Sequence, residues 1–279
     1  MKIGIYEEFP TRDNLERLRN IPVGIELVLA ARSLVKFRRK ETYVIRRFPH
    51  IVESITYWPT LLKREGYWFS PFANPEAVNR VLGEIEQRGD KERLRVMLDL
   101  ETPAMVNLGL LIRGIPTFDS VRRRIEKFIS RIGRNNLDLV CTEMPTLRMP
   151  EAMQRYLGLA FDPVKFGCEK TKMFYTSWAK LAADYLGQGF SRNSAVSLLK
   201  DEIRWGVRKY GEKFSIGLGF TAPGIMGTEP VMTVEQLEEE LAIARKMGVH
   251  KAYIFRLKGM TEAHGEVLKK FSISAPGRI

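Results

Sequence analysis

Residues 74–101, NPEAVNRVLGEIEQRGDKERLRVMLDLE, contain an expected helix followed directly by an expected strand. Asn74 is a good N-cap residue ahead of a proline, and apolar residues recur with helical spacing, so we expect a helix over Pro75–Gln87. The apolar run Leu94–Glu101 that follows has the length of a buried strand. This stretch therefore predicts one helix and strand unit of an α/β protein.

The same succession recurs along almost the whole chain. The eight expected strands are Lys2–Phe9, Val23–Ala30, Ser54–Pro59, Leu94–Glu101, Leu137–Glu143, Thr171–Trp178, Phe214–Phe220 and Lys251–Leu257. Eight strands that alternate with amphipathic segments predict an α/β fold of the (β/α)₈ or TIM-barrel type, formed by residues 1–279 as a single domain. An open, doubly wound sheet often carries a glycine-rich turn after its first strand, where this chain has Glu7, Glu8, Phe9 and Pro10 instead.

The composition excludes a disordered or fibrous chain. The sequence has 279 residues, of which 44% are hydrophobic and 28% charged, so it can bury one large core. No apolar run approaches the roughly 20 residues that a membrane span needs. The N-terminal segment does not resemble a signal peptide, and Cys141 and Cys168 lack the spacing of a zinc site or a disulfide framework. These features predict a cytoplasmic protein that does not enter membranes.

The net charge is strongly positive. Lysine and arginine number 45 against 33 acidic residues, a formal charge of +12 that would concentrate anionic partners. The basic residues are scattered in short groups, such as residues 36–40 and 122–124, in expected outer helices and loops. We therefore expect a solvated basic surface and only weak, non-specific, salt-dependent binding to nucleic acid. A non-catalytic barrel that binds anions or nucleic acid is kept as an alternative function.

Carboxylates dominate the expected C-terminal ends of the strands, where TIM barrels carry their active sites. The residues in question are Glu7, Asp99, Glu101, Glu143 and the cation Arg256. Asp99 and Glu101 are two positions apart in an extended segment and therefore point to the same side. Burying carboxylates is costly unless they have cationic partners, so the cluster indicates either a catalytic function or a buried ion network of Asp99, Glu101 and Arg256 that holds the barrel closed.

Aromatic residues are dense after the third strand. Residues 57–72 contain six aromatic side chains. Aromatic faces pack against the C–H face of a sugar ring, and carboxylates accept hydrogen bonds from its hydroxyl groups. The alternative is that these rings only pack the loop. The residues expected to bind a small-molecule or oligosaccharide ligand are Glu7, Tyr57, Trp58, Trp68 and Arg256.

Two short motifs resemble a known family. The sequence DLE at residues 99–101 and the sequence MFY at residues 173–175 are similar to the fourth-strand D-x-E and sixth-strand M-x-Y elements of chitinase-like glycoside hydrolases. The resemblance implies substrate-assisted cleavage of an N-acetylhexosamine linkage, with Glu101 as the acid, Asp99 orienting the acetamido group and Tyr175 donating a hydrogen bond to it. The positions of the family's earlier aspartates and eighth-strand tryptophan are occupied here by Leu94, Met97, Phe255 and Arg256. More broadly, the chain looks like archaeal-type barrel proteins, which implies no particular activity.

The second carboxylate of a catalytic pair is expected to be Asp99 or Glu143. Adjacent strands lie about 4.8 Å apart, so Glu101 and Glu143 at corresponding heights would place their carboxyl groups roughly 5 to 6 Å apart. That separation is typical of retaining glycosidases. The sequence therefore predicts retention of configuration.

A phosphate site is the competing hypothesis for an enzyme. Gly219, Gly224, Gly227 and Lys258 follow the seventh and eighth strands, where barrels commonly bind phosphate through backbone N–H groups. This alternative is an enzyme acting on a phosphorylated or anionic small molecule. It includes Mg²⁺ as a possible cofactor, held by oxygen ligands from Glu7, Asp99, Glu101 and Glu143. Zinc is not expected, because the three histidines lie away from the strand ends.

Overall fold

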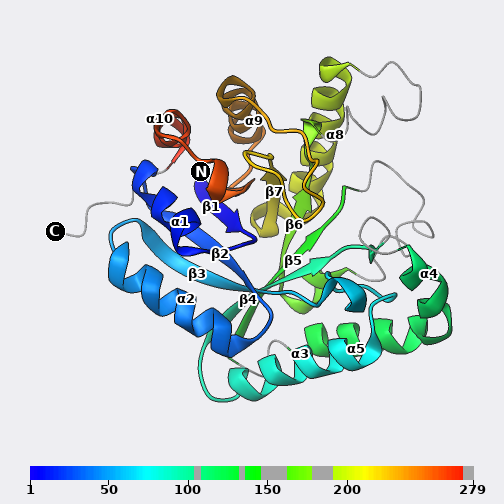
Figure 1. Ribbon diagram of the computed structural model, residues 1–279. Helices are drawn as coiled ribbons and strands as arrows, with labels where there is room; N and C mark the ends of the chain where they lie inside the picture. The colour runs from blue at the N-terminus through cyan, green and yellow to red at the C-terminus, as the bar shows by residue number, and fades with distance from the viewer. Residues whose placement is uncertain (104–107, 132–135, 146–161, 178–190, 273–279) are drawn as a thin grey trace. The chain divides into compact units, whose positions relative to one another are not determined.

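The computed structural model describes residues 1–103, 108–131, 136–145, 162–177 and 191–272. Within these ranges eight strands form a closed parallel barrel in chain order (Figure 1), which confirms the (β/α)₈ prediction. The strands are β1 (Lys2–Glu7), β2 (Ile25–Ala31), β3 (Val52–Pro59), β4 (Leu94–Leu100), β5 (Leu137–Glu143), β6 (Glu169–Met173), β7 (Phe214–Leu218) and β8 (Lys251–Phe255).

Helices alternate with these strands. They are α1 (Arg12–Glu16), α2 (Leu34–Arg47), α3 (Pro75–Gly89), α4 (Gly109–Gly114), α5 (Phe118–Ser130), α8 (Arg192–Tyr210), α9 (Val234–Lys246) and α10 (Glu262–Phe271). The Asn74 side chain accepts a hydrogen bond from the backbone N–H of Ala77 at 2.9 Å, so the expected N-cap of α3 is confirmed.

The sixth strand differs from the prediction. β6 begins at Glu169 and ends at Met173, whereas the apolar pattern predicted Thr171–Trp178. The early start coincides with an ion pair between Glu169 and Arg95 at 2.8 Å, and the early end precedes a side-chain hydrogen bond from Thr176 to α9. Residue 178 lies outside the described residues.

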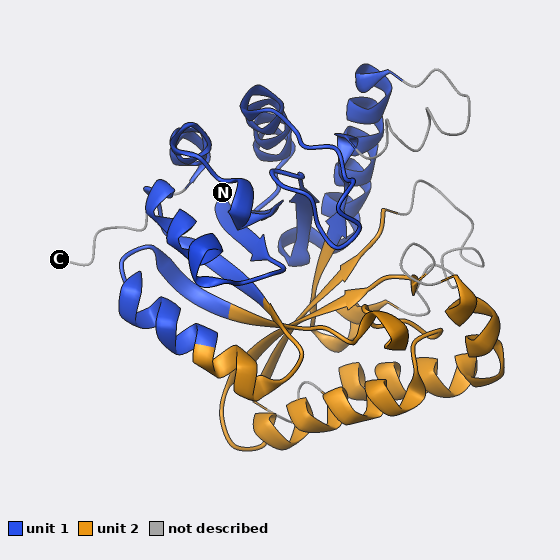
Figure 2. Cartoon of the chain, viewed as in Figure 1, with its two compact units in different colours: residues 1–29, 40–55, 172–279 blue, residues 30–39, 56–171 orange. Residues whose placement is uncertain are grey.

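The chain divides into two compact units, coloured in Figure 2. Unit 1 comprises residues 1–29, 40–55 and 172–279, and the described part of it includes β1, β7 and β8. In its core Gly4 lies against the ring of Tyr253, which stacks on Tyr6 with ring centroids 5.1 Å apart. The Tyr253 hydroxyl donates to Glu26, whose carboxylate also lies 3.0 Å from Lys251. Glu26 and Lys251 lie at the N-terminal ends of β2 and β8, the end of the fold that serves stability.

Unit 2 comprises residues 30–39 and 56–171. β4 and β5 pair in parallel over their full length, from Leu94 opposite Leu137 to Leu100 opposite Glu143. Near the start of these strands Arg95 lies 2.6 Å from Asp138. That residues 1–279 form a single domain stays a prediction.

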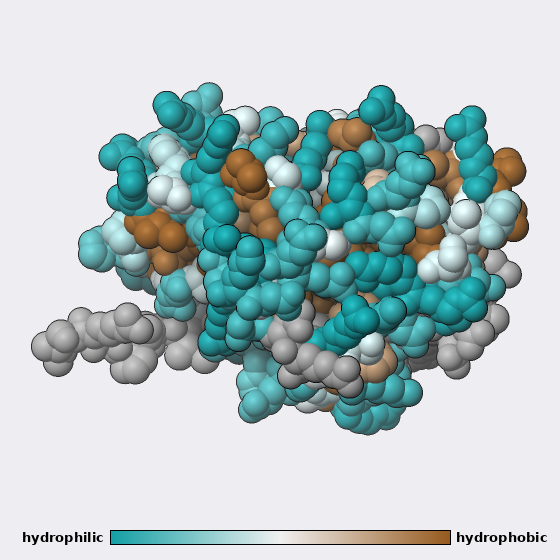
Figure 3. Space-filling model, turned by 90° about the horizontal axis from the view of Figure 1, so that it is seen from below, coloured by the Kyte–Doolittle hydropathy of each residue, from teal (hydrophilic) through white to brown (hydrophobic). Residues whose placement is uncertain are grey.

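Hydrophilic residues cover most of the face shown in Figure 3, and hydrophobic residues form separate patches on it. None of the helices in the described ranges has the length and hydrophobicity of a membrane-spanning segment.

Candidate functional site

β4 places two carboxyl groups at its C-terminal end, in unit 2. Asp99 is the penultimate residue of the strand and is 2% exposed, and Glu101 follows the strand directly. A hydrogen bond links the two side chains. Glu101 keeps part of its surface exposed, yet the protein around its carboxyl group removes enough water to raise the pKa to about 7, against the opposing effect of the hydrogen bond with Asp99. Glu101 can therefore hold a proton near neutral pH, as a general acid must.

The register of β4 and β5 separates Glu143 from this pair. Asp99 is opposite Thr142, and Leu100 is opposite Glu143. Partners in parallel strands share a face and successive residues alternate, so Asp99 and Glu143 lie on opposite faces of the sheet. The expectation that Glu143 lies beside Glu101 as a second catalytic carboxylate is therefore corrected.

Glu143 has a cationic partner of its own. Its carboxylate lies 3.0 Å from the ammonium of Lys170 on β6, and both side chains are buried. Lys172 shares that face of β6, and its ammonium lies over the ring of Trp205 in α8, 5.9 Å from the centroid. This face of β6 is therefore turned toward the helices, and Glu143 belongs to an ion pair between the neighbouring strands β5 and β6.

The two aromatic residues of β3 point in opposite directions. The ring of Tyr57 lies 4.8 Å from that of Phe37 in α2, and burial raises the pKa of its hydroxyl well above the usual value. Trp58 alternates with Tyr57 and therefore lies on the other, barrel-interior face of the strand, where it is buried. Tyr57 packs against a helix, so of the two only Trp58 is placed to face a ligand inside the barrel.

The aromatic loop after β3 is bound to the end of β4. The backbone N–H of Phe69 donates to the carbonyl of Asp99 at 2.8 Å. Trp68 meets Tyr67 edge to face at 5.3 Å, and Phe72 meets Phe118 at 5.0 Å. These loop rings are buried. The loop therefore fixes the backbone at Asp99, and Trp68 packs within it.

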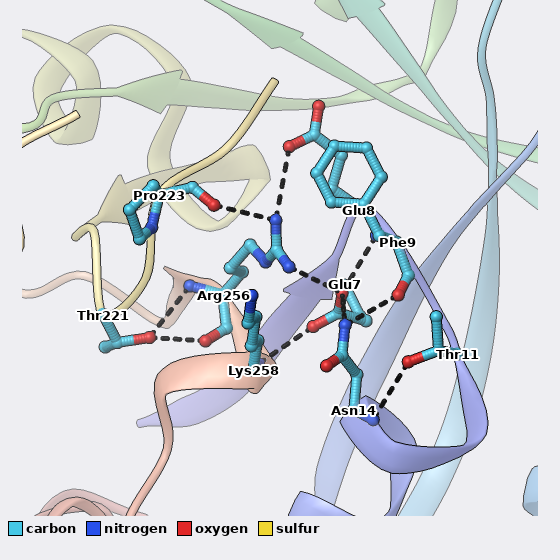
Figure 4. Close-up of polar contacts among 9 residues, drawn as sticks. All are labelled: Glu7, Glu8, Phe9, Thr11, Asn14, Thr221, Pro223, Arg256 and Lys258. Carbon is cyan, nitrogen blue, oxygen red and sulfur yellow. Dashed lines mark hydrogen bonds and ion pairs between the residues drawn. The ribbon is translucent and has the colours of Figure 1, made fainter. Parts of the chain in front are cut away.

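Glu7, at the end of β1 in unit 1, receives hydrogen bonds from two loops (Figure 4). It accepts from the backbone N–H groups of Phe9 and Lys258, both at 2.9 Å, and from the amide of Asn14 at 3.2 Å. The guanidinium of Arg256 lies 3.5 Å away. Burial raises the pKa of Glu7, and the charge of Arg256 opposes that rise. Glu7 therefore holds the loops after β1 and β8 together.

Arg256 is 1% exposed and contacts three segments of unit 1. Its guanidinium donates to the carbonyl of Pro223 at 2.8 Å, lies 3.9 Å from Glu8 and stacks over the ring of Phe9 at 4.6 Å (Figure 4). The ion pairs that the structure gives to Arg256 are with Glu7 and Glu8. The sequence predicted a network of Arg256 with Asp99 and Glu101, whereas the structure pairs Arg256 with Glu7 at the end of β1 and with Glu8 directly after it.

Tyr175 lies in unit 1, two residues beyond the end of β6. Its ring centroid is 4.4 Å from that of Phe220 and 6.1 Å from that of Phe255. The three rings form an aromatic cluster beside the loops that follow β7 and β8.

One glycine of the predicted phosphate site, Gly224, has carboxylates beside it. A Cβ atom at Gly224 would lie 2.9 Å from Glu8 and 3.0 Å from Glu229. Gly219 and Gly227 adopt positive φ angles of 127° and 78°. The backbone N–H of Lys258 is bound to Glu7, and the Lys258 side chain is exposed. Negative charge beside Gly224 repels a phosphate, so this geometry does not favour the phosphate alternative.

Glu229 was not predicted as a site residue. It stands in a loop without periodicity, between Thr228 and Pro230, and is 5% exposed. A carboxylate in a glycine-rich loop after a barrel strand is the one sequence signal that could have indicated it.

No family model matches this chain, and no curated protein does so. Solved structures of similar fold include the spore cortex-lytic enzyme SleL of Bacillus megaterium QM B1551, with a TM-score of 0.56 and 9% identity over 98% of this chain and 74% of that one. A chitinase from Chromobacterium violaceum has a TM-score of 0.55 and 10% identity over 96% and 98% of the two chains. A GH5-4 broad-specificity endoglucanase from Bacteroides salanitronis has a TM-score of 0.53 and 10% identity over 93% and 85%. At such identities the likeness shows that these proteins share the barrel fold.

Two of the four carboxylates considered for Mg²⁺ are engaged by other groups. The oxygens of Glu7 are occupied by N–H donors, and the carboxylate of Glu143 is paired with Lys170. In the described part of the chain, no group of three or more histidine, cysteine, aspartate or glutamate side chains is arranged to hold a metal ion.

Many surface arginines are paired with carboxylates. Examples are Arg124 with Glu86 at 2.8 Å, Arg192 with Glu239 at 2.6 Å and Arg204 with Asp201 at 2.7 Å. These pairs lie on different helices, which agrees with the expected solvated surface. Weak binding to nucleic acid stays a prediction.

Proposed function

We propose that this protein is a glycoside hydrolase in which Glu101 is the general acid and Asp99 its carboxylate partner. The observation that supports this most is the raised pKa of Glu101, about 7, beside a second, deeply buried carboxyl group. Glycosidic cleavage requires an acid that is still protonated near neutral pH and a second group that stabilises the positive charge developing at the sugar. The raised pKa of Glu101 supports the first role, and the position of Asp99 beside it supports the second.

In the route that the resemblance to chitinase-like enzymes implies, Glu101 protonates the glycosidic oxygen as its bond to the anomeric carbon breaks. The acetamido oxygen of the substrate attacks that carbon, while Asp99 accepts a hydrogen bond from the acetamido N–H. Glu101, now a carboxylate, then takes a proton from the water that opens the cyclic intermediate. Retention of configuration stays the predicted outcome, with the acetamido group in the nucleophilic role and Glu143 outside the reaction.

The other residues of unit 2 support this proposal by position. The hydrogen bond from Phe69 to the Asp99 carbonyl fixes the backbone next to the pair. Trp58, on the interior face of β3, offers an aromatic face for a sugar ring. The chitinase, the endoglucanase and the cortex-lytic enzyme named above share the barrel fold, which agrees with a glycosidase built on it.

The experiment is a screen of aryl N-acetylhexosaminides and aryl glucosides with the wild type, Glu101→Gln and the control Glu266→Gln. Glu266 lies on the exposed surface of α10, so its variant should behave as the wild type. Glu101→Gln should lose about 100-fold or more in turnover while it keeps substrate binding, because the amide cannot donate the acid's proton. Absence of cleavage by the wild type, or full activity of Glu101→Gln, would contradict the proposal.

A further inference from the structure

A buried polar cluster in unit 1 has no part in the mechanism proposed above. It consists of Glu8 after β1, Glu229 in the loop between β7 and α9, and Arg256 after β8. Their exposed fractions are 5%, 5% and 1%. Burying charged groups is unfavourable unless each is paired and hydrogen-bonded. A buried cluster of three charged side chains therefore indicates a function that offsets its cost.

Gly224 allows the two carboxylates to come together. The position of a Cβ atom on Gly224 would be 2.9 Å from the Oε2 of Glu8 and 3.0 Å from the Oε1 of Glu229, so both oxygens border the space that a side chain at residue 224 would fill. The neighbouring Pro223 carbonyl binds the guanidinium of Arg256, which lies 3.9 Å from Glu8. One loop segment therefore gathers all three charged side chains.

Two atoms of this cluster have open hydrogen-bonding capacity. Glu229 is held in place because its Oε1 accepts from the backbone N–H of Met226 at 3.1 Å. Its Oε2, an acceptor, and the Nε of Arg256, a donor, are buried and have no hydrogen-bond partner within the described residues. A hydroxyl group both donates and accepts, so it can satisfy an acceptor and a donor of this kind together.

Aromatic rings border the same residues. The ring of Phe255 reaches within 2.9 Å of the Cβ position on Gly224, and it lies 4.8 Å from Phe220. Phe9 covers the guanidinium of Arg256 (Figure 4). Carboxylates and a guanidinium beside aromatic faces are the combination that binds a sugar ring, through hydroxyl groups on its edge and C–H groups on its face.

We propose that Glu8, Glu229 and Arg256 form a saccharide-binding site for a neutral ligand rich in hydroxyl groups, with Gly224 as the residue that allows the two carboxylates to approach. The two carboxylates discriminate against phosphorylated sugars by charge repulsion. The inference rests on the proposed function for the class of ligand, but binding here requires neither Asp99 nor Glu101.

The test measures the binding of chitobiose, cellobiose and glucose 6-phosphate by isothermal titration calorimetry. All proteins carry Glu101→Gln, so that a cleavable ligand stays intact. Added to this background, Glu229→Gln and Gly224→Ala are each expected to weaken binding of a neutral disaccharide at least tenfold, since one weakens an acceptor and the other forces the carboxylates apart. Glu266→Gln is the matched control and should change nothing. Circular dichroism and thermal melting establish that each variant is folded.

The outcomes separate this proposal from the proposed function. Unchanged binding by folded Glu229→Gln and Gly224→Ala variants overturns the site, as does preferred binding of glucose 6-phosphate or no binding of either disaccharide. Cleavage by the wild type that is lost in Glu101→Gln supports the glycosidase whatever happens to Glu229. Loss of binding in Glu229→Gln, in a protein whose wild type cleaves no glycoside, supports the site and contradicts the glycosidase.

Discussion

The ammonium of Lys170 lies 3.0 Å from the carboxylate of Glu143, and both side chains are buried in unit 2. The pair joins neighbouring strands β5 and β6 on the face turned toward the helices. A carboxylate held in this way by a cation is a structural group, and it is not available to a substrate inside the barrel. The alternation of side chains along β5 therefore places Glu143 on the face opposite to that of Asp99, whose side chain is hydrogen-bonded to Glu101.

Removing one member of this pair should destabilise the protein strongly. Glu143→Gln removes the nearer and more deeply buried counter-charge of Lys170, whose ammonium also lies 4.0 Å from Asp162. Breaking a buried pair typically costs about 3–5 kcal/mol, and the residual attraction to Asp162 places the expected loss toward the lower value. Urea denaturation followed by circular dichroism measures the free energy of unfolding. The control is Asp201→Asn, which breaks the exposed pair with Arg204 and should cost at most about 1 kcal/mol. Equal effects of the two substitutions would contradict the assignment.

The activity should depend on pH through Glu101. The acid form of this group is the reactive one, and burial raises its pKa to about 7. The value of kcat/KM is therefore expected to fall tenfold per pH unit above about pH 7, as Glu101 loses its proton. Initial rates on an aryl N-acetylhexosaminide between pH 3.5 and pH 9 give the profile. A descending limb that starts near pH 4.5, the ordinary value for a glutamate, would show that Glu101 is not the acid.

The fold could be predicted from the sequence because the helices and strands that local sequence patterns favour are the ones that the barrel contains. The cap at Asn74, the helical spacing up to Gln87 and the apolar run from Leu94 each specify an element without knowledge of distant residues. The sixth strand was displaced because Glu169 and Lys170, which read as polar positions before a strand, are paired with Arg95 and Glu143 from other strands. Such pairings depend on tertiary structure.

The sequence predicted which residues lie at the ends of the strands, but it did not predict which residues of neighbouring strands share a face of the sheet. Alternation along β5 places Cys141 and Glu143 on one face, but which face is interior depends on the register with β4. The sequence does not specify that register. Glu229 was missed because a loop position has no periodicity. It lies near Glu8 only in the folded chain, where the two carboxylates border Gly224 although they are far apart in the sequence.

A second buried carboxyl group should make stability depend on pH. Glu240 of α9 is fully buried, accepts a hydrogen bond from Thr176, and has a pKa raised by burial to about 7 from the ordinary value of 4.5. Because the folded-state pKa is the higher one, the stabilisation is complete below pH 4.5 and is lost as pH rises through about 7. Relative to the wild type, Glu240→Gln should gain on the order of 2–3 kcal/mol between pH 4 and pH 8.

Urea denaturation of both proteins at pH 4, 6 and 8 measures this difference, which should grow with pH. The other titrating groups are common to both proteins and cancel in the comparison. A difference that is constant over the three pH values would show that Glu240 ionises as easily in the folded protein as in the unfolded chain.

Two glycines should respond to alanine in opposite directions. A Cβ atom at Gly259, in the loop after β8, would lie 1.8 Å from the backbone carbonyl oxygen of Thr221, and backbone cannot move aside as a flexible side chain can. Gly259→Ala must displace one of the two loops and is expected to cost about 1–3 kcal/mol or more. Gly83 lies within α3 with no other atom within 4 Å of its Cβ position, so Gly83→Ala should add about 0.5–1 kcal/mol of stability through helix propensity.

Thermal and urea denaturation measure the change in the free energy of unfolding for the two variants. If Gly259→Ala were as stable as the wild type while Gly83→Ala gained the expected amount, the loops after β7 and β8 would not be packed backbone against backbone, and the placement of Arg256 between them would lose its structural basis.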